Sequence, residues 1–354
     1  MSILTTETRG GMVENVHCGT VCVVSERGVE YSCGRYTDDY FFRSSSKPIQ
    51  ALPVLLLGLD KKYGLSDDEC AIMAGSNAGE IYCTDVVRSL MEKAGVTEDD
   101  LVMKPRYSSP EGTKFAALAA GEAPKKIWHG CTPKHIGCIL VQRELTGSGK
   151  GYEQPDSAVQ RLIRYVISMF TDTPYDNIRL GCDGCGVPVF AVPGPALAKS
   201  YLRMACPELL PDASMAAVTA RMVSLMNQYP QLVRGRDYIC SVMNSFPNIT
   251  AKGGASGVYT FGLKKERLGV MLKIYDGTET SWQPVIAEIL RQVSPEINRD
   301  LIEKLENTEL IGTTCRNIRN MTGAVIGEMT PVFRLEKHSR DITLSHMKMF
   351  NVCT

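Results

Sequence analysis

The hydrophobic pattern of the chain changes twice, from strand-like near the start to helical in the middle and back to strand-like. Near the start, VENVHCGTVCVVS and GVEYSCGRYTDDYFF are rich in β-branched and aromatic residues, and Glu26-Arg27-Gly28 separates them. Such runs on either side of a short polar segment predict two strands joined by a turn. Further on, GVYTFGL and LGVMLKIYDG flank a polar turn at 264–267, which predicts a hairpin, and GAVIGEMTPVFRLE predicts a last strand.

Between these segments, up to about residue 245, apolar residues recur at helical spacing, as in KPIQALPVLLLG and CTDVVRSLMEKAG. The same spacing returns later in WQPVIAEILRQV. Ser66 precedes Glu69 by three positions, which is the pattern of a capping box. Asp156 and Asp212 are placed to cap the helices predicted over DSAVQRLIRYVISMF and ASMAAVTARMVSLMNQY.

The order of these elements, strands then helices then strands, is typical of the α+β class. We therefore expect one domain over 1–354 with two lobes. The sheet lobe would come from about 10–48 and 250–335, which makes an antiparallel sheet from both chain ends. The helical lobe would cover about 49–249.

The composition narrows the expected partners and compartment. The chain has 39 basic and 39 acidic side chains, a balance that gives no electrostatic reason to expect nucleic acid or an anionic membrane as partner. The start, MSILTTETRGG, lacks the basic residues and apolar run of a signal peptide, and no stretch is apolar over enough length to span a bilayer. The 13 cysteines are odd in number and scattered, which favours free thiols in a reducing cytoplasm over a disulfide framework.

The stretch FRSSSKPIQ contains Ser44 and Lys47 at a spacing of three, which places them on one face of a helix. A lysine there can take the proton of the serine if burial or a nearby cation lowers its pKa. The same Ser-x-x-Lys spacing occurs in serine β-lactamases and penicillin-binding proteins. A serine run before an apolar helix is also an ordinary helix cap, and Pro48 disfavours helical backbone at Lys47 unless a tight turn leads into the helix. The motif alone leaves both interpretations open.

Two cysteine-containing segments, HGCTPKHIGC and GCDGCGVPVF, offer a second candidate site. Cys182 and Cys185 form a Cys-x-x-Cys, and Cys131, His135 and Cys138 cluster upstream. Zinc takes four ligands of these kinds. A chain so rich in cysteine also buries thiols in its core as small apolar groups, so the spacing alone does not decide for a metal.

Three further positions carry chemistry only in combination with others. Lys252 stands before Gly253 and Gly254 and next to a predicted strand, where glycines allow a backbone to approach a ligand closely. Ser76 lies in a glycine-containing break between two predicted helices, and Asp183 lies near glycines in GCDGCG. Taken singly, these are a hairpin entry, a loop and a turn.

Taken together and in order, these segments resemble those of the Rhizobium etli-type L-asparaginases, also called asparaginase II or class 3. The likeness begins at RGGMVENVHCG and fades after about residue 335, and it passes through RSSSKPIQALP, GLSDDE, SNAGE, CTPKHIGC, DGCGVPVFAVP, AKGGASGVYTFGL and KIYDG. The resemblance implies a fold similar to serine β-lactamases and glutaminases. It also implies hydrolysis of the side-chain amide of L-asparagine to aspartate and ammonia, by a chain that forms a homodimer.

In this family two Ser-Lys pairs meet in the active site. Our hypothesis for the reaction is covalent amide hydrolysis, in which one serine forms an acyl-enzyme. The resemblance does not say which serine attacks first. It pairs Ser44 with Lys47, and Ser76 with Lys252. The catalytic positions that it implies are two serines, two lysines, an aspartate and an arginine: Ser44, Lys47, Ser76, Lys252, Asp183 and Arg43.

The family's zinc ligands, two cysteines and a lysine, correspond to Cys131, Lys134 and Cys185, so Cys182 drops out as a ligand. A lysine binds zinc only as the neutral amine, so the cation must strongly depress its pKa. Three protein ligands leave a fourth position open for water or substrate. The cofactor implied by the resemblance is therefore zinc, which in this family helps to orient the substrate.

This chain departs from the usual family pattern around the substrate and the metal. Asn77 stands where the family usually has histidine, His129-Gly130 where it has Asn-Asn, and Thr132-Pro133 where it has Ser-Gly. The catalytic positions are retained. These departures keep open another small amide as substrate, such as glutamine or a β-aspartyl compound. The expected substrate contacts are His135, Asn77, Gly253 and Gly254.

A third reading is a non-catalytic relative that holds zinc or senses a ligand. Such a protein would have no need for two lysines beside two serines. It would leave both ammonium groups solvated and out of reach of the serines, whereas a general base must lie within hydrogen-bond distance of the proton it takes.

Overall fold

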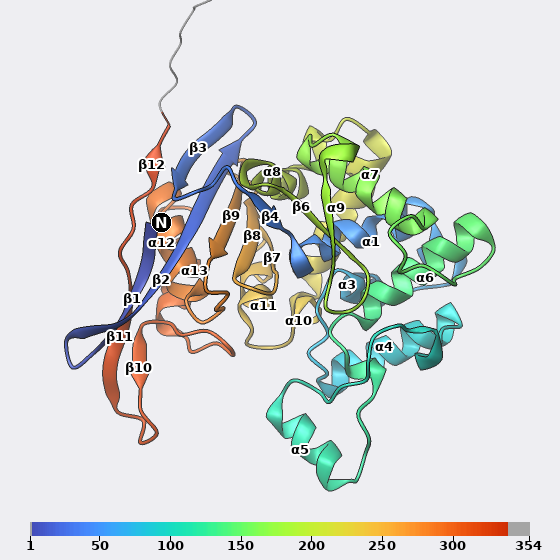
Figure 1. The fold of residues 1–354 in the computed structure, drawn as a ribbon, viewed down its shortest axis with the longest axis horizontal. Helices are drawn as coiled ribbons and strands as arrows, with labels where there is room; N and C mark the ends of the chain where they lie inside the picture. The colour runs from blue at the N-terminus through green and yellow to red at the C-terminus, as the bar shows by residue number, and fades with distance from the viewer. Residues whose placement is uncertain (1, 339–354) are drawn as a thin grey trace, which may run out of the picture.

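The computed structural model describes residues 2–338, and in this part of the chain one nine-stranded sheet lies beside a group of helices (Figure 1). The strands follow the order β10-β11-β1-β2-β9-β8-β7, with β3 also paired to β2 and β12 paired to β3, and every pair is antiparallel. The predicted α+β class, with an antiparallel sheet made from both chain ends, is confirmed. The strands are β1 (Ser2–Arg9), β2 (Met12–Ser25), β3 (Gly28–Cys33), β7 (Ile249–Gly253), β8 (Val258–Leu263), β9 (Leu268–Ile274), β10 (Asn317–Arg319), β11 (Val325–Pro331) and β12 (Glu336–Lys337).

Helices cover both faces of the sheet. The helix α8 (Gly194–Ala205) packs on β8, β9 and β2, while α12 (Trp282–Val293) and α13 (Arg299–Asn307) lie on the opposite face. At Gly262 and Gly269 an added Cβ would lie 2.1 Å from the backbone oxygens of Tyr201 and Ala198 in α8. These two glycines therefore let the helix backbone rest directly on the strands.

The remaining helices form the second lobe, with α1 at its centre. Every residue of α1 from Lys47 to Leu55 is buried, and the helix packs against α9, α6, α7 and α3. An apolar helix buried on all sides is expected at the centre of a helical layer. The helices of this lobe are α1 (Lys47–Leu56), α2 (Leu59–Lys62), α3 (Asp67–Met73), α4 (Ile81–Ala94), α5 (Glu111–Ala119), α6 (Thr132–Thr146), α7 (Ala158–Thr171), α9 (Ala213–Gln228), α10 (Pro230–Val233) and α11 (Ile239–Asn244).

A second, three-stranded sheet runs in the order β4-β6-β5, with β4 (Asp39–Phe41), β5 (Arg179–Cys182) and β6 (Pro188–Pro193). It corrects the predicted lobes, because β5 and β6 fall inside the segment predicted to be helical. The strand predicted over GVEYSCGRYTDDYFF is also divided, since β3 joins the large sheet and β4 the small one. The main sheet starts at Ser2 rather than near residue 10.

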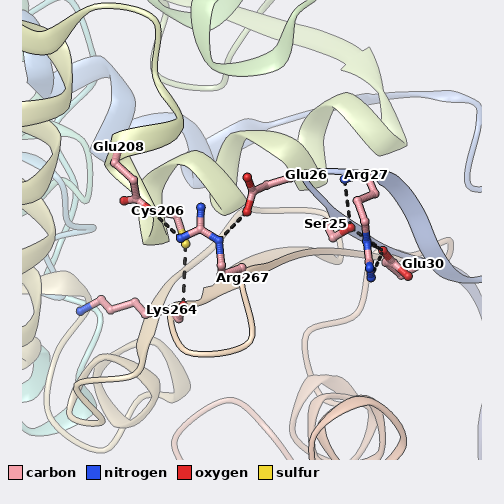
Figure 2. Close-up of polar contacts among 8 residues, drawn as sticks. All are labelled: Ser25, Glu26, Arg27, Glu30, Cys206, Glu208, Lys264 and Arg267. Carbon is pink, nitrogen blue, oxygen red and sulfur yellow. Dashed lines mark hydrogen bonds and ion pairs between the residues drawn. The ribbon is translucent and has the colours of Figure 1, made fainter.

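An arginine in the turn between β8 and β9 joins three separate turns of the fold (Figure 2). Arg267 contacts Glu26 in the turn between β2 and β3, and Glu208 beyond the end of α8. In the neighbouring turn, Arg27 donates from Nε to Glu30 at 3.0 Å. These ion pairs are exposed, so each adds little stability, but together they mark where two hairpins meet α8.

Several local predictions can be judged directly. The capping box of Ser66 and Glu69 is present at the start of α3, and Asp212 caps α9 by accepting from the N–H of Met215. The cap of α7 is Ser157 rather than the predicted Asp156, because the Ser157 hydroxyl accepts from the N–H of Gln160.

Each cysteine among the described residues has a free thiol. None of the helices within 2–338 is long and apolar enough to cross a membrane.

Candidate active site

The serine run forms a short 3₁₀ turn, η1 (Arg43–Ser46), which leads directly into α1 at Lys47. Pro48 therefore falls in the first turn of α1, where a missing N–H loses no hydrogen bond. This tight turn resolves the conflict that the sequence poses between a helical Lys47 and the proline after it. It also keeps Ser44 and Lys47 one helical turn apart.

The three serines of the run have different surroundings. The hydroxyl of Ser45 donates to the backbone carbonyl of Phe42 at 2.6 Å, and that of Ser46 donates to the carbonyl of Arg43 at 2.9 Å. These two hydroxyls therefore close the turn. Ser44 instead lines a cavity, and within the described chain its hydroxyl makes no hydrogen bond to another protein group.

The cavity has a volume of about 220 Å³ and lies between η1, the loop after α3, the start of α6 and the loops that follow α10 and β9. A larger hollow of about 790 Å³, near Asp172 and Arg179, shares no residue with it and contains neither serine of the predicted site. The small cavity is the one that contains both serines of the predicted site. Its lining residues are Ser44, Lys47, Ser76, Asn77, Ala78, Arg106, Ser109, His129, Gly130, Cys131, Arg234, Tyr238, Ala255 and Glu279.

Lys47 is the most unusual residue of this cavity, because its side chain is almost completely buried, with 1 % of the residue exposed. Lysine is almost never fully buried without a partner. Its Nζ donates to Ser76 Oγ at 3.0 Å and to the carbonyl of Gly130 at 2.7 Å. Burial, helped by the charge of Lys134, lowers the pKa of Lys47, so a larger fraction of this amine is neutral than in water. The observed lysine–serine contact thus joins Lys47 to Ser76, whereas the resemblance pairs Lys47 with Ser44.

Ser76 is held by the loop that follows α3. Its N–H donates to the carbonyl of Val233 at 2.9 Å, which fixes the loop against the end of α10. The next residue, Asn77, is buried and donates from Nδ2 to the carbonyl of Ile127 at 2.8 Å, while its Oδ1 accepts from the N–H of Gly79 at 2.8 Å. The side-chain amide of Asn77 therefore supports the loop. Its nitrogen and its oxygen both already bind backbone groups of the protein.

Lys252 lies on β7 with none of its surface exposed. Burial, and then the charges of Lys47 and Arg234, lower the pKa of Lys252 to about 8, although nearby Cys240 opposes this shift. Its Nζ donates to the carbonyl of Gly253 at 2.8 Å and makes no hydrogen bond to either predicted serine in the described chain. Its charge nevertheless acts within range of Lys47, so the two lysines belong to one electrostatic neighbourhood.

The glycines after Lys252 bring β7 against η1. A Cβ added to Gly254 would lie 2.6 Å from the backbone oxygen of Phe42 and 3.1 Å from Cβ of Arg43, while one added to Gly253 would meet the ring of Trp282 at 3.0 Å. Both glycines are thus required for packing of the strand. Neither lines the cavity, so the predicted substrate contact through them is not seen in this structure.

The residue before Ser44 has a strained backbone. Arg43 has φ of 51°, in the left-handed region that side chains other than glycine seldom adopt. Its Nε donates to Asp183 Oδ1 at 3.1 Å and its Nη1 to Ser256 Oγ at 2.9 Å. Such strain persists only where surrounding contacts hold it, and it is common at functional sites. The predicted Arg43–Asp183 pair is therefore present beside Ser44, as a support for the turn that carries it.

The three predicted zinc ligands lie together. Lys134 is buried, and its Nζ donates to Cys185 Sγ at 3.1 Å, while the thiols of Cys131 and Cys185 are hydrogen-bonded to each other. Two thiolates are usual zinc ligands, and Lys134 could join them only as the neutral amine, so the set fits zinc only once this lysine has lost its proton. No cluster of at least three His, Cys, Asp or Glu side chains suitable for a metal occurs among residues 2–338, and this set has only two such residues because its third member is lysine. Cys182 is exposed and lies outside the cluster.

The charges in this cluster favour a thiolate. The hydrogen bond with Cys185, and then the ammonium groups of Lys47 and Lys134, hold the pKa of Cys131 well below its usual value. Burial lowers the pKa of Lys134, but the neighbouring thiols of Cys131 and Cys185 outweigh burial and raise it. Zinc bound here would therefore have to displace the proton of that lysine.

His135, expected near the substrate, lies instead in the core of the helical lobe. It has no exposed surface and does not line the cavity, and its Nδ1 lies 2.8 Å from the hydroxyl of Tyr152. Burial holds its pKa well below the usual value, and its Nε2 has no partner in the described chain. The histidine on the cavity wall is His129, whose Nδ1 accepts from the N–H of Cys131 at 3.0 Å.

Five charged or polar residues of the cavity were missed by the sequence reasoning: Arg106, Ser109, Arg234, Tyr238 and Glu279. Each lies in a loop rather than in a recognisable motif. Only the arrangement of those loops in space brings them to the serines, so no pattern of spacing could have found them.

Comparison with known proteins places this geometry in context. A protein-family model described as L-asparaginase II matches residues 5–331. No curated protein matches the chain. Among solved structures, a β-lactamase from Mycobacterium bovis shares 15 % identity with a TM-score of 0.42, covering 78 % of this chain and 95 % of that one. A Bacillus glutaminase shares 12 % identity with a TM-score of 0.32, covering 73 % of this chain and 83 % of that one. TM-scores this low support no conclusion about function.

Proposed function

The chain belongs to the L-asparaginase II family, and we propose that it is an amidohydrolase that cleaves the side-chain amide of L-asparagine to aspartate and ammonia. The observation that carries this proposal is the buried Lys47, hydrogen-bonded to Ser76 in the same cavity that Ser44 lines. A lysine whose pKa is lowered by burial is suited to accept the proton of a serine. A binding protein has no comparable need for a desolvated amine that contacts one serine hydroxyl in a cavity holding a second serine.

We assign the attack to Ser44, whose hydroxyl is unbonded in the described chain and opens on the cavity. Its oxygen forms a bond to the amide carbon while its proton passes to Lys47, one helical turn away. The C–N bond then breaks, and the proton moves from Lys47 through Ser76 and Lys252 to the departing ammonia. Water next attacks the acyl-enzyme with Lys47 again accepting a proton, and aspartate is released as Ser44 regains its hydrogen.

We propose that Lys252 also takes part in this proton transfer. Its amine is buried and within electrostatic range of Lys47. We assign it the relay of protons between Ser76 and the leaving amine, which requires that it be neutral at the start of a cycle. Arg43 and Asp183 hold the strained turn in place rather than contacting the substrate.

Cys131, Lys134 and Cys185 are the residues that would hold a zinc ion. Such an ion would supply a Lewis acid that helps to orient the substrate. The steps assigned to Ser44, Lys47 and Ser76 need no proton or electron from it.

The non-catalytic reading is disfavoured by the same contact. It requires solvated ammonium groups away from the serines, whereas Lys47 and Lys252 are both buried and Lys47 bonds Ser76. Another small amide remains the main alternative substrate. A dimer, which the family resemblance implies, and a reducing cytoplasm, which the scattered cysteines favour, complete the proposal.

The decisive experiment measures ammonia release by the purified protein from L-asparagine, L-glutamine and a β-aspartyl dipeptide. We expect asparagine to have the highest kcat/KM and Ser44→Ala to lose almost all turnover. A higher kcat/KM for glutamine or the dipeptide would identify that compound, instead of asparagine, as the substrate. Ammonia release by Ser44→Ala as fast as by the parent would refute the mechanism.

A further inference from the structure

Two oppositely charged side chains, Arg234 and Glu279, lie on the wall of the cavity that holds both serines. Arg234 Nη2 is 3.3 Å from Glu279 Oε2, and the two side chains are 29 % and 30 % exposed. They come from different parts of the chain, one after α10 and the other in the loop before α12. A partly exposed ion pair in a catalytic cavity can exchange its partner for a charged ligand without burying an unpaired charge.

Most of the hydrogen-bonding capacity of this pair is unused. A guanidinium has several N–H donors and a carboxylate has two acceptor oxygens. Within the described chain, the side-chain contacts of Arg234 are the single bond to Glu279 and stacking of its guanidinium 5.2 Å from the ring centre of Tyr238. Donors therefore remain for a carboxylate, which guanidinium binds through paired hydrogen bonds. Glu279 Oε1 remains for an ammonium group.

The loop of Arg234 is fixed to the loop of Ser76. The residue before it, Val233, accepts the N–H of Ser76 at 2.9 Å. The residue after it, Gly235, has φ of 148°, and a Cβ there would lie 2.9 Å from Cβ of Ala78. This close packing fixes the backbone of Arg234 relative to Ser76, and the contacts with Glu279 and Tyr238 position its guanidinium, as a recognition group requires.

The loop of Glu279 is equally well ordered by hydrogen bonds. Thr278 donates its N–H to Asp276 Oδ1 at 2.8 Å, and Thr280 accepts the N–H of Thr314 at 2.9 Å. The carbonyl of Glu279 itself accepts from the N–H of Trp282 at the start of α12. Both members of the pair are thus held by their backbones before a ligand arrives.

The other charged groups near Ser44 are already committed. Arg43 bonds Asp183 and Ser256, and neither member of the Arg43–Asp183 pair lines the cavity. Arg106 lines it, but its guanidinium bonds the carbonyl of Tyr107 and the hydroxyl of Ser109 in its own loop. Among the described residues, Arg234 and Glu279 are the ion pair that faces the cavity.

We propose that Arg234 binds the α-carboxylate and Glu279 the α-ammonium of the amino-acid amide, so that the enzyme selects zwitterionic substrates. This inference rests on the proposed hydrolysis and names what recognises the end of the substrate that does not react. The cavity volume of about 220 Å³ agrees with a small ligand, since sites for drug-sized molecules occupy roughly 300–1,000 Å³.

The test crosses two variants with three amides. The variants are Arg234→Gln and Glu279→Gln, and the substrates are L-asparagine, succinamate, which lacks the amine, and 3-aminopropanamide, which lacks the carboxylate. Arg234→Gln should raise KM by about ten- to a hundredfold for asparagine and succinamate and leave KM for 3-aminopropanamide within about twofold. Glu279→Gln should raise KM to the same extent for asparagine and 3-aminopropanamide and spare succinamate.

Arg316→Gln is the matched control, because Arg316 pairs with Glu328 at 3.2 Å and does not line the cavity, and its KM values should equal those of the parent. Equal effects of a variant on all three amides, or no effect, would overturn the proposal. The selective pattern in Arg106→Gln instead of Arg234→Gln would also overturn it.

Binding separates this inference from the proposed hydrolysis. If the parent releases ammonia from none of the amides, the hydrolase proposal fails, but calorimetric titration of L-asparagine into the parent and the two variants still decides the recognition. Binding that weakens at least tenfold in both variants supports the proposed recognition by Arg234 and Glu279. Unchanged binding in the variants, or no binding to the parent, refutes it.

Discussion

The side-chain nitrogen of Lys47 lies 3.0 Å from the hydroxyl oxygen of Ser76, although the two residues are 29 positions apart in the chain. Ser44, which is one helical turn from Lys47 in sequence, lines the same cavity without a hydrogen bond from that lysine in the described chain. One buried amine therefore contacts one serine hydroxyl and shares a cavity with a second serine. In the proposed mechanism, this single lysine serves both the attacking and the leaving side of the amide.

Substitution of the serines should separate attack from proton transfer. We expect Ser44→Ala to lower kcat by at least about a thousandfold, and Ser76→Ala by about 10²–10⁴-fold, because it removes a proton-transfer group. Rapid quenching followed by peptide mass spectrometry should find the acyl group on Ser44.

Ser46→Ala is the control, since the Ser46 hydroxyl only closes the turn by donating to the carbonyl of Arg43. This variant should lose about 1 kcal/mol of stability and keep kcat within a few-fold of the parent value. An acyl group on Ser76 would reverse the assigned roles.

Packing of β7 against η1 should also be essential to turnover. Gly254→Ala places a Cβ 2.6 Å from the backbone oxygen of Phe42, which cannot move as a flexible side chain would. We expect η1 to shift, kcat to fall at least about tenfold, and stability to fall by about 1–3 kcal/mol. Gly112→Ala in α5, where no atom lies within 4 Å of the added carbon, should leave kcat unchanged and should not lower stability, since alanine favours the helix over glycine. Normal kinetics in Gly254→Ala would show that the turn is not sensitive to its neighbour strand.

Metal analysis can test the zinc ligands without an activity assay. The purified protein should contain about one zinc per chain, because two thiols and a buried amine form a suitable donor set. Cys131→Ser and Cys185→Ser should each lose most of this zinc. Cys182→Ser is a matched control from the same Cys-x-x-Cys, and its exposed thiol lies outside the cluster. Equal zinc in all the variants would place the metal elsewhere.

The pH dependence should report Lys252. Its pKa is lowered to about 8, so the neutral amine needed for the relay forms as pH rises through that value. We therefore expect kcat/KM to increase with pH around 8 and then level off. Arg234→Gln removes a positive charge that lowers this pKa and should move the rise to higher pH, whereas Glu279→Gln should move it to lower pH. A profile that is flat between about pH 7 and pH 9 would exclude Lys252 from the proton path.

The sequence predicts the fold class well because hydrophobic period and element order are local properties. The strand–helix–strand order gives the α+β class, and the spacing of Ser66 and Glu69 gives a capping box. The small sheet was missed because β5 is a short, exposed strand and β6 sits among glycines and prolines that suggest loops. The predicted cap Asp156 was displaced by its neighbour Ser157, a competition between adjacent capping residues that spacing cannot resolve.

For the candidate site, too, the sequence predicts local features better than contacts between distant segments. Positions that lie in motifs, such as Ser44, Lys47 and Cys185, could be identified from the sequence through family resemblance. Their contacts could not, because the bond from Lys47 to Ser76 depends on how α1 packs against the loop after α3. Arg234 and Glu279 carried no signal at all, since single charged residues in loops are usually solvated.

The main sheet pairs strands from both ends of the chain, which affects how the protein folds during synthesis. Ser44 and Lys47 leave the ribosome early, but Gly254, which abuts their turn, and the strands beside β7 are translated much later. Pairings between such distant segments form slowly, and chains of this size generally fold through intermediates. A nascent polypeptide therefore contains Ser44 and Lys47 long before β7 can pack against their turn, so the proposed site is completed late in folding.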